Sequence, residues 1–280
     1  MSAARDPRSP FDPTTAMDVP PEPAPIVQPA PAPPPPRRLG AARAFGILTA
    51  YLLAQFAVGF VVLVAAQSYV GSRITDSAAI ASRAETLTLL PAALIGTILG
   101  AVAAFRMTRR SFPGAIASGA LRPIGWSAAP PRMLAWCALL GAVIAMSVEY
   151  LLVRHLPLRP DQSLGPVVQA AMSSGFSRLC WAILAVGVAP PAEEFLFRGV
   201  LLHGFARTWN VTVAVIVTSV LFVALHLPET RSYWPALIGI SLLAAATMAV
   251  RLKSRKLLPA VAVHAGYNLA LVLLVYVHMP

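Results

Sequence analysis

Long apolar stretches alternate with short polar segments along most of the chain. A helix needs about 20 apolar residues to cross a bilayer, so each stretch predicts one membrane-crossing helix. The predicted helices lie near residues 44–66, 87–105, 133–153, 179–202, 211–227, 235–250 and 257–278. Because a transmembrane helix satisfies its own backbone polar groups, we expect an all-α polytopic transmembrane helical bundle with about seven spans. A re-entrant segment around 111–130 is the alternative that would make eight.

Composition supports a membrane protein. Hydrophobic residues make up 57% of the 280 residues and charged residues 12%, about half the charged fraction of a soluble domain. The net charge of +11 does not indicate nucleic-acid binding, because the basic residues flank the apolar spans and are not interleaved with aromatic residues. The lipid bilayer is therefore the expected partner, and nucleic acid is excluded.

The distribution of the basic residues predicts the orientation. Most of the 22 Lys and Arg residues fall in segments on one side if the N-terminus is cytoplasmic, including the clusters at 106–110 and 251–256. The positive-inside rule then places the C-terminus outside. Arginine outnumbers lysine, and alanine and proline are abundant, which indicates a bacterium. We therefore expect a multi-pass protein of the bacterial inner (cell) membrane.

The first 39 residues differ from the rest. Almost half of the 27 prolines lie there, and no apolar periodicity is present. Such a segment cannot bury enough apolar surface to fold. We expect a disordered, proline-rich cytoplasmic tail at 1–39 and a transmembrane helical domain at 40–280.

Two adjacent glutamates, Glu193 and Glu194, lie inside an apolar stretch directly after Pro190 and Pro191. A carboxylate in a bilayer costs about 3 kcal/mol even on the gentler insertion scales, so this pair needs a reason. Proline cannot extend a helix normally, because it lacks an amide donor. The sequence predicts a kink or break there, with a new helical run starting near Pro191 and both glutamates in its first turn.

Spacing separates the roles of the two glutamates. Glu194 and Arg198 stand at i and i+4, so they share a helix face and can form an ion pair. Glu193 has Phe197 at i+4 and no comparable local cation. Glu193 is therefore the carboxylate left free to bind a water molecule and act as a base.

Three more polar residues lie in apolar segments. His226 ends the run 220–225, and His264 and Asn268 stand at i and i+4 in the last span, so they project from one face. Alone, each would be read as a hydrogen-bond partner between helices. Together with the two glutamates they indicate one functional constellation.

These residues also resemble a known family. Glu193-Glu194-x-x-x-Arg198, Phe222-x-x-x-His226 and His264-x-x-x-Asn268 are similar to the three signatures of the CPBP intramembrane proteases. That family includes the type II CAAX prenyl endopeptidases and the bacterial Abi or bacteriocin-immunity proteins. The resemblance covers a protease-like core at 179–272, and the first 130 residues show none.

The resemblance implies a glutamate-dependent intramembrane endopeptidase that acts on a peptide or membrane-protein substrate. Glu193 and His226 would activate a water molecule, and His264 and Asn268 would stabilise the oxyanion. Glu194 and Arg198 would support the site. Two cofactor interpretations stay open: no metal at all, which we favour, or a zinc ion held by Glu193, His226 and His264.

The sequence leaves one alternative function open, and the predicted depths of the site residues disagree with one another. The alternative is a non-proteolytic membrane protein, either a peptide-binding scaffold or a proton-coupled transporter. The inconsistency concerns depth: the rise along each predicted helix places Glu193 and His264 in the inner half of the bilayer, but His226 near the outer face. Either the fifth helix starts inside the bilayer, or the fourth and fifth helices have other boundaries.

Overall fold

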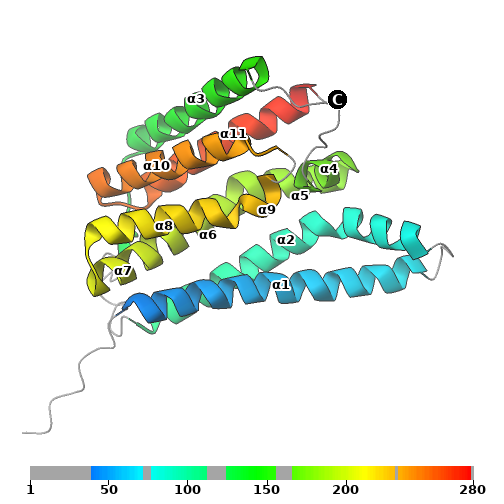
Figure 1. The fold of residues 1–280 in the computed structure, drawn as a ribbon, viewed down its shortest axis with the longest axis horizontal. Coiled ribbons are helices and arrows are strands. Elements are labelled where there is room, and N and C mark those ends of the chain that lie inside the picture. Colours follow the sequence, from blue (N-terminus) through cyan, green and yellow to red (C-terminus); the bar gives the residue numbers. More distant parts are fainter. Residues whose placement is uncertain (1–38, 72–76, 112–123, 156–165, 231–232, 279–280) are drawn as a thin grey trace, which may run out of the picture. The chain divides into compact units, whose positions relative to one another are not determined.

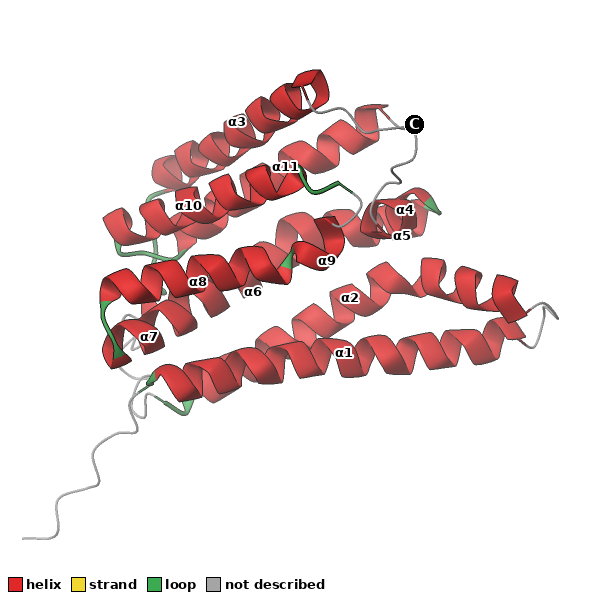
Figure 2. Ribbon diagram, viewed as in Figure 1, coloured by secondary structure: helices red, strands yellow, loops and turns green. Residues whose placement is uncertain are grey.

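The described part of the chain belongs to one unit, Pro36–Pro280. Every regular element within it is a helix, and no strand occurs among the described residues (Figure 2). The predicted tail at 1–39 lies outside these residues except for Leu39. The computed structural model describes residues 39–71, 77–111, 124–155, 166–230 and 233–278.

The helices are of two kinds, long helices and short consecutive segments (Figure 1). The long helices are α1 (Ala41–Gly71), α2 (Ser77–Arg109), α3 (Pro131–His155), α8 (Val211–Leu225), α10 (Ala236–Ser254) and α11 (Leu258–His278). The short segments are α4 (Pro166–Met172), α5 (Gly175–Ala182), η2 (Ile183–Val188), α6 (Ala189–Glu194), η3 (Phe195–Leu201), α7 (Leu202–Thr208) and α9 (Leu227–Thr230). The segments η2 and η3 are π-helices.

Six helical stretches in the described part of the chain are long and apolar enough to cross a membrane. The described part of the chain is all-helical, and the protein is an integral membrane protein with several passes. The expected fifth span differs, because α8 has only 15 residues. At 1.5 Å per residue it extends about 22 Å, less than the hydrocarbon core of about 30 Å. The six stretches are Ala41–Tyr69, Thr88–Arg109, Pro131–Leu152, Gly175–Thr208, Ala236–Ser254 and Leu258–Val277.

Helices α1 and α2 pack closely along each other. Gly96 and Gly100, four residues apart on α2, leave room for α1, since a Cβ atom at Gly96 would lie 3.1 Å from the Cα of Gln55. Small residues at this spacing let helix backbones approach in membranes. The Gln55 side chain uses this proximity, because its Nε2 donates a hydrogen bond to Thr97 Oγ1 at 2.8 Å.

Helices α3 and α11 cross in the same way. A Cβ atom at Gly141 would collide with the carbonyl oxygen of Val263, and one at Gly266 would collide with that of Ala138. The two backbones are therefore in contact at Gly141 of α3 and at Gly266 of α11. This contact holds α11, which carries two of the predicted site residues, against α3.

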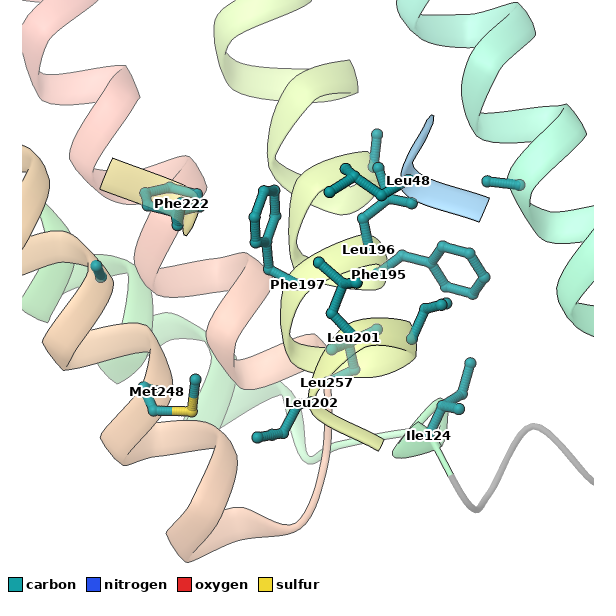
Figure 3. Close-up of a cluster of buried hydrophobic side chains, with 14 of the residues drawn as sticks. Leu48, Ile124, Phe195, Leu196, Phe197, Leu201, Leu202, Phe222, Met248 and Leu257 are labelled. Atoms are coloured by element: carbon teal, nitrogen blue, oxygen red, sulfur yellow. The ribbon is translucent and has the colours of Figure 1, made fainter. Parts of the chain in front are cut away.

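The buried core is centred on η3. All seven of its residues are buried, and Phe195, Leu196 and Phe197 belong to the largest apolar cluster (Figure 3). Side chains from distant parts of the chain surround them. These include Leu48 of α1, Ile124, Phe222 of α8, Met248 of α10 and Leu257. The segment that follows the two glutamates is therefore enclosed by protein.

The predicted re-entrant segment at 111–130 lies mostly outside the described residues. Its described end, 124–130, forms a turn and a loop and not a continuous helix. The carbonyl of Gly125 accepts a hydrogen bond from the backbone of Leu257 at 2.7 Å, and Gly125 has a φ of 85°, which favours glycine. This loop therefore covers the start of α11.

Candidate active site

The glutamates lie in one helical path from Gly175 to Thr208 that is not broken at Pro190 and Pro191. The π-helix η2 precedes them, and α6 begins at Ala189, so the prolines lie near its start where their missing amides matter least. A helical run therefore begins close to the predicted place. The prediction that the glutamates lie in its first turn is wrong, because α6 starts before the prolines and ends at Glu194.

Pro190 leaves one backbone carbonyl of η2 without its usual partner. The Ala189 amide donates to the carbonyl of Leu184, and Pro190 has no amide to donate to the carbonyl of Ala185. The side chain of Asn268 on α11 supplies the missing donor, with Nδ2 2.7 Å from the Ala185 oxygen. Asn268 therefore ties α11 to η2, and one of its two amide protons is already used.

Glu194 and Arg198 form a buried ion pair, as their spacing predicts. Arg198 Nε lies 3.2 Å from Glu194 Oε2, and both side chains are 0% exposed. Arg198 Nη2 donates to the carbonyl of Ala244 on α10 at 3.1 Å, and its Cζ lies 4.3 Å from the centre of the Phe222 ring. The pair therefore connects η3 with α8 and α10.

The second oxygen of Glu194 orients a histidine. Glu194 Oε1 lies 3.0 Å from His264 Nδ1, and the carbonyl of Phe222 lies 2.8 Å from His226 Nδ1. A carbonyl or an ionised carboxylate only accepts hydrogen bonds, so both Nδ1 atoms carry a proton. In the neutral ring the proton-free nitrogen is then Nε2, for His226 and for His264.

Both Nε2 atoms face Glu193. They lie 3.9 Å (His226) and 4.0 Å (His264) from Glu193 Oε2. That oxygen is buried and has no hydrogen-bond partner among the described residues. Three hydrogen-bond acceptors, Glu193 Oε2 and the two histidine Nε2 atoms, thus face one another. With neutral histidine rings, none of these three atoms carries a proton to donate to the others. The Glu193 and His226 side chains remain 21% and 22% exposed. A water molecule, which has two protons to donate, suits this arrangement.

The inconsistency in depth disappears in the structure. The fourth passage continues to Thr208 and not to 202, and α8 then runs back from Val211. Fifteen residues separate Glu193 from Thr208, and fifteen separate Val211 from His226, which follows the last residue of α8. The two side chains therefore meet at one level. The predicted boundaries of the fourth helix, 179–202, were wrong, whereas the fifth helix begins at Val211 as predicted.

Two residues near the site received no role from the sequence. The Phe222 ring is fully buried and lies 4.7 Å from the His226 ring and 5.8 Å from the His264 ring, centre to centre. Its position four residues before His226 was the available signal. Glu229 follows His226 by three residues, and its amide donates to the His226 carbonyl at 3.2 Å.

The charge of Glu229 responds to the site. Partial removal from water raises the pKa of its carboxyl, although part of the side chain stays exposed. Attraction to His226 lowers this pKa, and repulsion from Glu193 raises it, both by smaller amounts. Glu229 is therefore a charged neighbour of the site and not a remote surface residue.

The spacing of the possible ligands bears on the zinc alternative. Glu193, His226 and His264 offer donor types that zinc accepts, and their Nδ1 bonds leave both Nε2 atoms available. Ligand atoms around a tetrahedral zinc ion lie about 3.3 Å apart, closer than the distances to Glu193 above. No group of three or more His, Cys, Asp or Glu in the described ranges could hold a metal ion. The spacing thus does not fit.

A comparison with protein families adds an independent observation. Residues 174–270 match the family model described as Type II CAAX prenyl endopeptidase Rce1-like. This part of the chain is an Rce1-like domain of that peptidase family. The match confirms the resemblance read from the sequence, and its range is close to the predicted core at 179–272. Neither curated proteins nor solved structures gave a match.

The Rce1-like domain contains every predicted site residue and covers about one third of the chain. Glu193, Glu194 and Arg198 lie on α6 and η3, and His226 follows α8. His264 and Asn268 lie on α11. Helices α1, α2 and α3 lie outside the matched range.

The ion pair predicts how the domain responds to loss of one charge. Arg198→Met leaves the Glu194 carboxylate buried without its partner, which typically costs about 3–5 kcal/mol. We expect a large fall in the thermal unfolding midpoint of the purified protein in detergent. The double variant Glu194→Gln/Arg198→Met should be less destabilised than the sum of the single variants. Arg207→Met, at an exposed arginine of α7, is the control. An Arg198→Met protein as stable as this control would contradict the interpretation.

Asn268 predicts a separate effect on stability. Asn268→Ala leaves the Ala185 carbonyl in a membrane-spanning segment without a donor, which costs about 1–3 kcal/mol. We therefore expect a lower unfolding midpoint in detergent even without any substrate. Asn268→Asp should behave similarly, because an ionised carboxylate cannot donate. Unchanged midpoints for both variants would show that this hydrogen bond contributes nothing to stability.

Proposed function

We propose that this protein is an intramembrane endopeptidase that hydrolyses a peptide bond with a water molecule activated by Glu193 and His226. The observation that carries the proposal is the convergence of Glu193 Oε2, His226 Nε2 and His264 Nε2 around a buried carboxylate oxygen without a hydrogen-bond partner in the described chain. The Rce1-like domain supports it, because that family consists of peptidases.

In the proposed reaction, water donates its protons to the acceptors around Glu193. Its oxygen attacks the carbonyl carbon of the peptide bond, and one proton passes to the Glu193 carboxylate. The carbonyl oxygen becomes an oxyanion on a tetrahedral intermediate. Protonation of the amide nitrogen by Glu193 then lets the C–N bond break, which yields a carboxylic acid and an amine. The base is thereby regenerated.

The oxyanion needs hydrogen-bond donors, and two residues on α11 can supply them. Asn268 has a second amide proton besides the one bonded to Ala185. His264 donates from Nε2 only when both ring nitrogens carry protons. The Glu194 carboxylate, 3.0 Å from Nδ1, holds the ring in this orientation. Donors placed in advance at an oxyanion typically contribute about 3–4 kcal/mol to catalysis.

Glu194 and Arg198 act through other groups in this proposal. Glu194 fixes the ring of His264, and Arg198 neutralises Glu194. Arg251 of α10 helps to hold the same segment, because its Nε donates to the Arg198 carbonyl at 3.1 Å. The π-helix η3 is thereby joined to α10 through both the side chain and the backbone of Arg198.

The proposed setting is a bacterial inner membrane with a cytoplasmic N-terminus. The positive-inside distribution of Lys and Arg supports this orientation. Helix α8 would form a seventh, shallower passage that ends at His226, followed by the return of the chain through α10. The substrate would be a peptide or a membrane protein whose scissile bond reaches the level of Glu193.

The role of Glu193 predicts a loss of cleavage without a loss of folding. We expect Glu193→Ala and Glu193→Gln to lower the cleavage rate at least about a hundredfold, because neither side chain can accept the proton from water. Candidate substrates come from a proteomic comparison of membranes that contain the wild-type protein or Glu193→Ala. Cleavage is then measured on these peptides with purified protein.

Glu149→Gln is the matched control, since Glu149 is another glutamate within a span but lies on α3. It should cleave at the wild-type rate. Normal processing by Glu193→Ala, in cells and with purified protein, would contradict the proposal. It would favour a peptide-binding scaffold instead.

The role of a metal is tested separately. Because the ligand spacing does not fit a metal ion, we expect cleavage by purified protein to survive treatment with 1,10-phenanthroline or EDTA. Zinc content is measured on the same samples. Loss of cleavage on chelation, restored by added zinc, would show that Glu193, His226 and His264 move together around a metal.

A further inference from the structure

An apolar groove runs between α3 and α11 on the outside of the bundle. Ten residues line it, four from α3 and six from α11, and every one of them is apolar. Its volume is about 520 Å³. Met146 of α3 and Leu273 of α11, which both line the groove, are 48% and 54% exposed. The groove is therefore open toward the surroundings of the bundle.

Small residues form the bottom of the groove. Gly266 and Ala270 of α11 line it and are buried, whereas the neighbouring lining residue Leu269 is exposed. The backbones of α3 and α11 are in contact at Gly141 and Gly266, so no side chain fills the space beside this contact. Long side chains at the edges and small ones at the bottom make a depression that suits a thin apolar chain.

The groove lies close to the end of the bundle at which both helices start. Helix α3 begins at Pro131 and α11 at Leu258. The turn before α11 is bonded to the loop before α3, because the Leu257 amide donates to the Gly125 carbonyl at 2.7 Å. The residues of α3 that line the groove, 138–146, follow Arg132 by about 9–21 Å at 1.5 Å per residue. Half of a hydrocarbon core is about 15 Å, so the groove lies at the depth of an acyl chain whose headgroup is level with Arg132.

Two cations stand at this end of the groove. Arg132 is exposed in the first turn of α3, and Lys256 Nζ donates to the Ala128 carbonyl at 2.6 Å, four residues before Arg132. That ammonium group has two further protons to donate. The described segments 124–148 and 233–278 contain no Asp or Glu. Neither segment therefore supplies a carboxylate that could pair with these cations.

The position of Arg132 makes an external anion favourable. The start of a helix carries a partial positive charge, and α3 has no acidic residue in its first turn to balance the added cation. Arg132 and Leu139, a lining residue, stand at i and i+7 and share one face of α3. Trp136, one turn after Arg132, is 70% exposed, and exposed tryptophan is typical of the headgroup level of a membrane. An anion bound here would thus lie at the headgroup level and at the start of the groove.

We propose that α3 and α11 form a binding site for an anionic phospholipid, with its phosphate at Arg132 and Lys256 and an acyl chain in the groove. The opposite end of α3 is less suited to an anion. Arg154 already donates to the Tyr150 hydroxyl at 3.1 Å, and Glu149 is a nearby carboxylate along the same helix. The site does not depend on proteolysis, so its failure would leave the proposed function unchanged.

The groove and the candidate active site use different faces of α11. Leu273 follows His264 by nine residues, which is two and a half helical turns and places the two on opposite faces. A lipid in the groove would therefore contact the back of the helix that carries His264. It would hold this helix in place without reaching the reacting groups.

Thermal unfolding of the full-length protein in detergent tests the site. Phosphatidylglycerol and phosphatidylcholine with the same palmitoyl and oleoyl chains are added in parallel, and inorganic phosphate is added in a third series. We expect phosphatidylglycerol to raise the unfolding midpoint by about 3 °C or more beyond phosphatidylcholine, because a ligand that binds the folded state stabilises it. Inorganic phosphate should leave the midpoint unchanged. Native mass spectrometry should show phosphatidylglycerol retained on the wild-type protein.

Variants test the two parts of the site separately. Arg132→Gln and Lys256→Gln should each remove about half or more of the phosphatidylglycerol shift, whereas Arg154→Gln, at the other end of α3, should keep it. Ala142→Phe fills the groove and should abolish the shift. Ser147→Phe adds the same ring at an exposed position of α3 outside the groove and should keep it. Leu273→Trp, at an exposed position of α11, narrows the groove from its other side and should also lower the shift.

Several outcomes would overturn the inference. Equal shifts with both lipids would show that the cations select nothing, and a shift with inorganic phosphate alone would indicate a site for the free ion. A full phosphatidylglycerol shift in both Ala142→Phe and Leu273→Trp would show that the groove holds no acyl chain. A dimer in light scattering that Ala142→Phe makes monomeric would assign the groove to a second copy of the chain.

Discussion

Burying the Glu194–Arg198 pair determines the arrangement of the site. Two charges removed from water need partners besides each other, and the chain supplies several of them, although Arg198 Nη1 has no hydrogen-bond partner among the described residues. His264 comes from α11, the Ala244 carbonyl from α10, and the Phe222 ring from α8. The side chains proposed for catalysis are therefore placed by the solvation needs of a pair that does no chemistry itself.

The backbone carbonyls of η2 and η3 also need hydrogen-bond partners from other helices. A membrane offers no water to unpaired carbonyls, so irregular turns persist only where other groups supply donors. Asn268 donates to Ala185 in η2, and Arg251 donates to Arg198 in η3. Both π-helices thus depend on side chains from other helices. The prolines and the π-helical turns leave carbonyls without their usual donors inside the membrane. Side chains of other helices, such as Asn268 of α11, supply the missing donors.

Much of this was accessible from the sequence, because each successful inference rested on a local rule. Membrane-length apolar runs predicted the helices, and the i, i+4 spacing predicted the ion pair of Glu194 with Arg198. Polar residues inside apolar spans indicated the site, and the resemblance implied their roles. The partner of Asn268 was not predictable, because it depends on which carbonyl a proline leaves unpaired and on which helix passes by.

The short length of α8 has a consequence for the surrounding lipid. Helices such as α1 and α11 match or exceed the hydrocarbon thickness, whereas α8 ends at His226 after 15 residues. Such hydrophobic mismatch is relieved by local thinning of the bilayer or by water at the helix end. On the proposed seventh passage, the place where the lipid would yield is the place where Glu193 and His226 keep about a fifth of their surface exposed. One short helix would thus admit the water that hydrolysis consumes without a channel through the bundle.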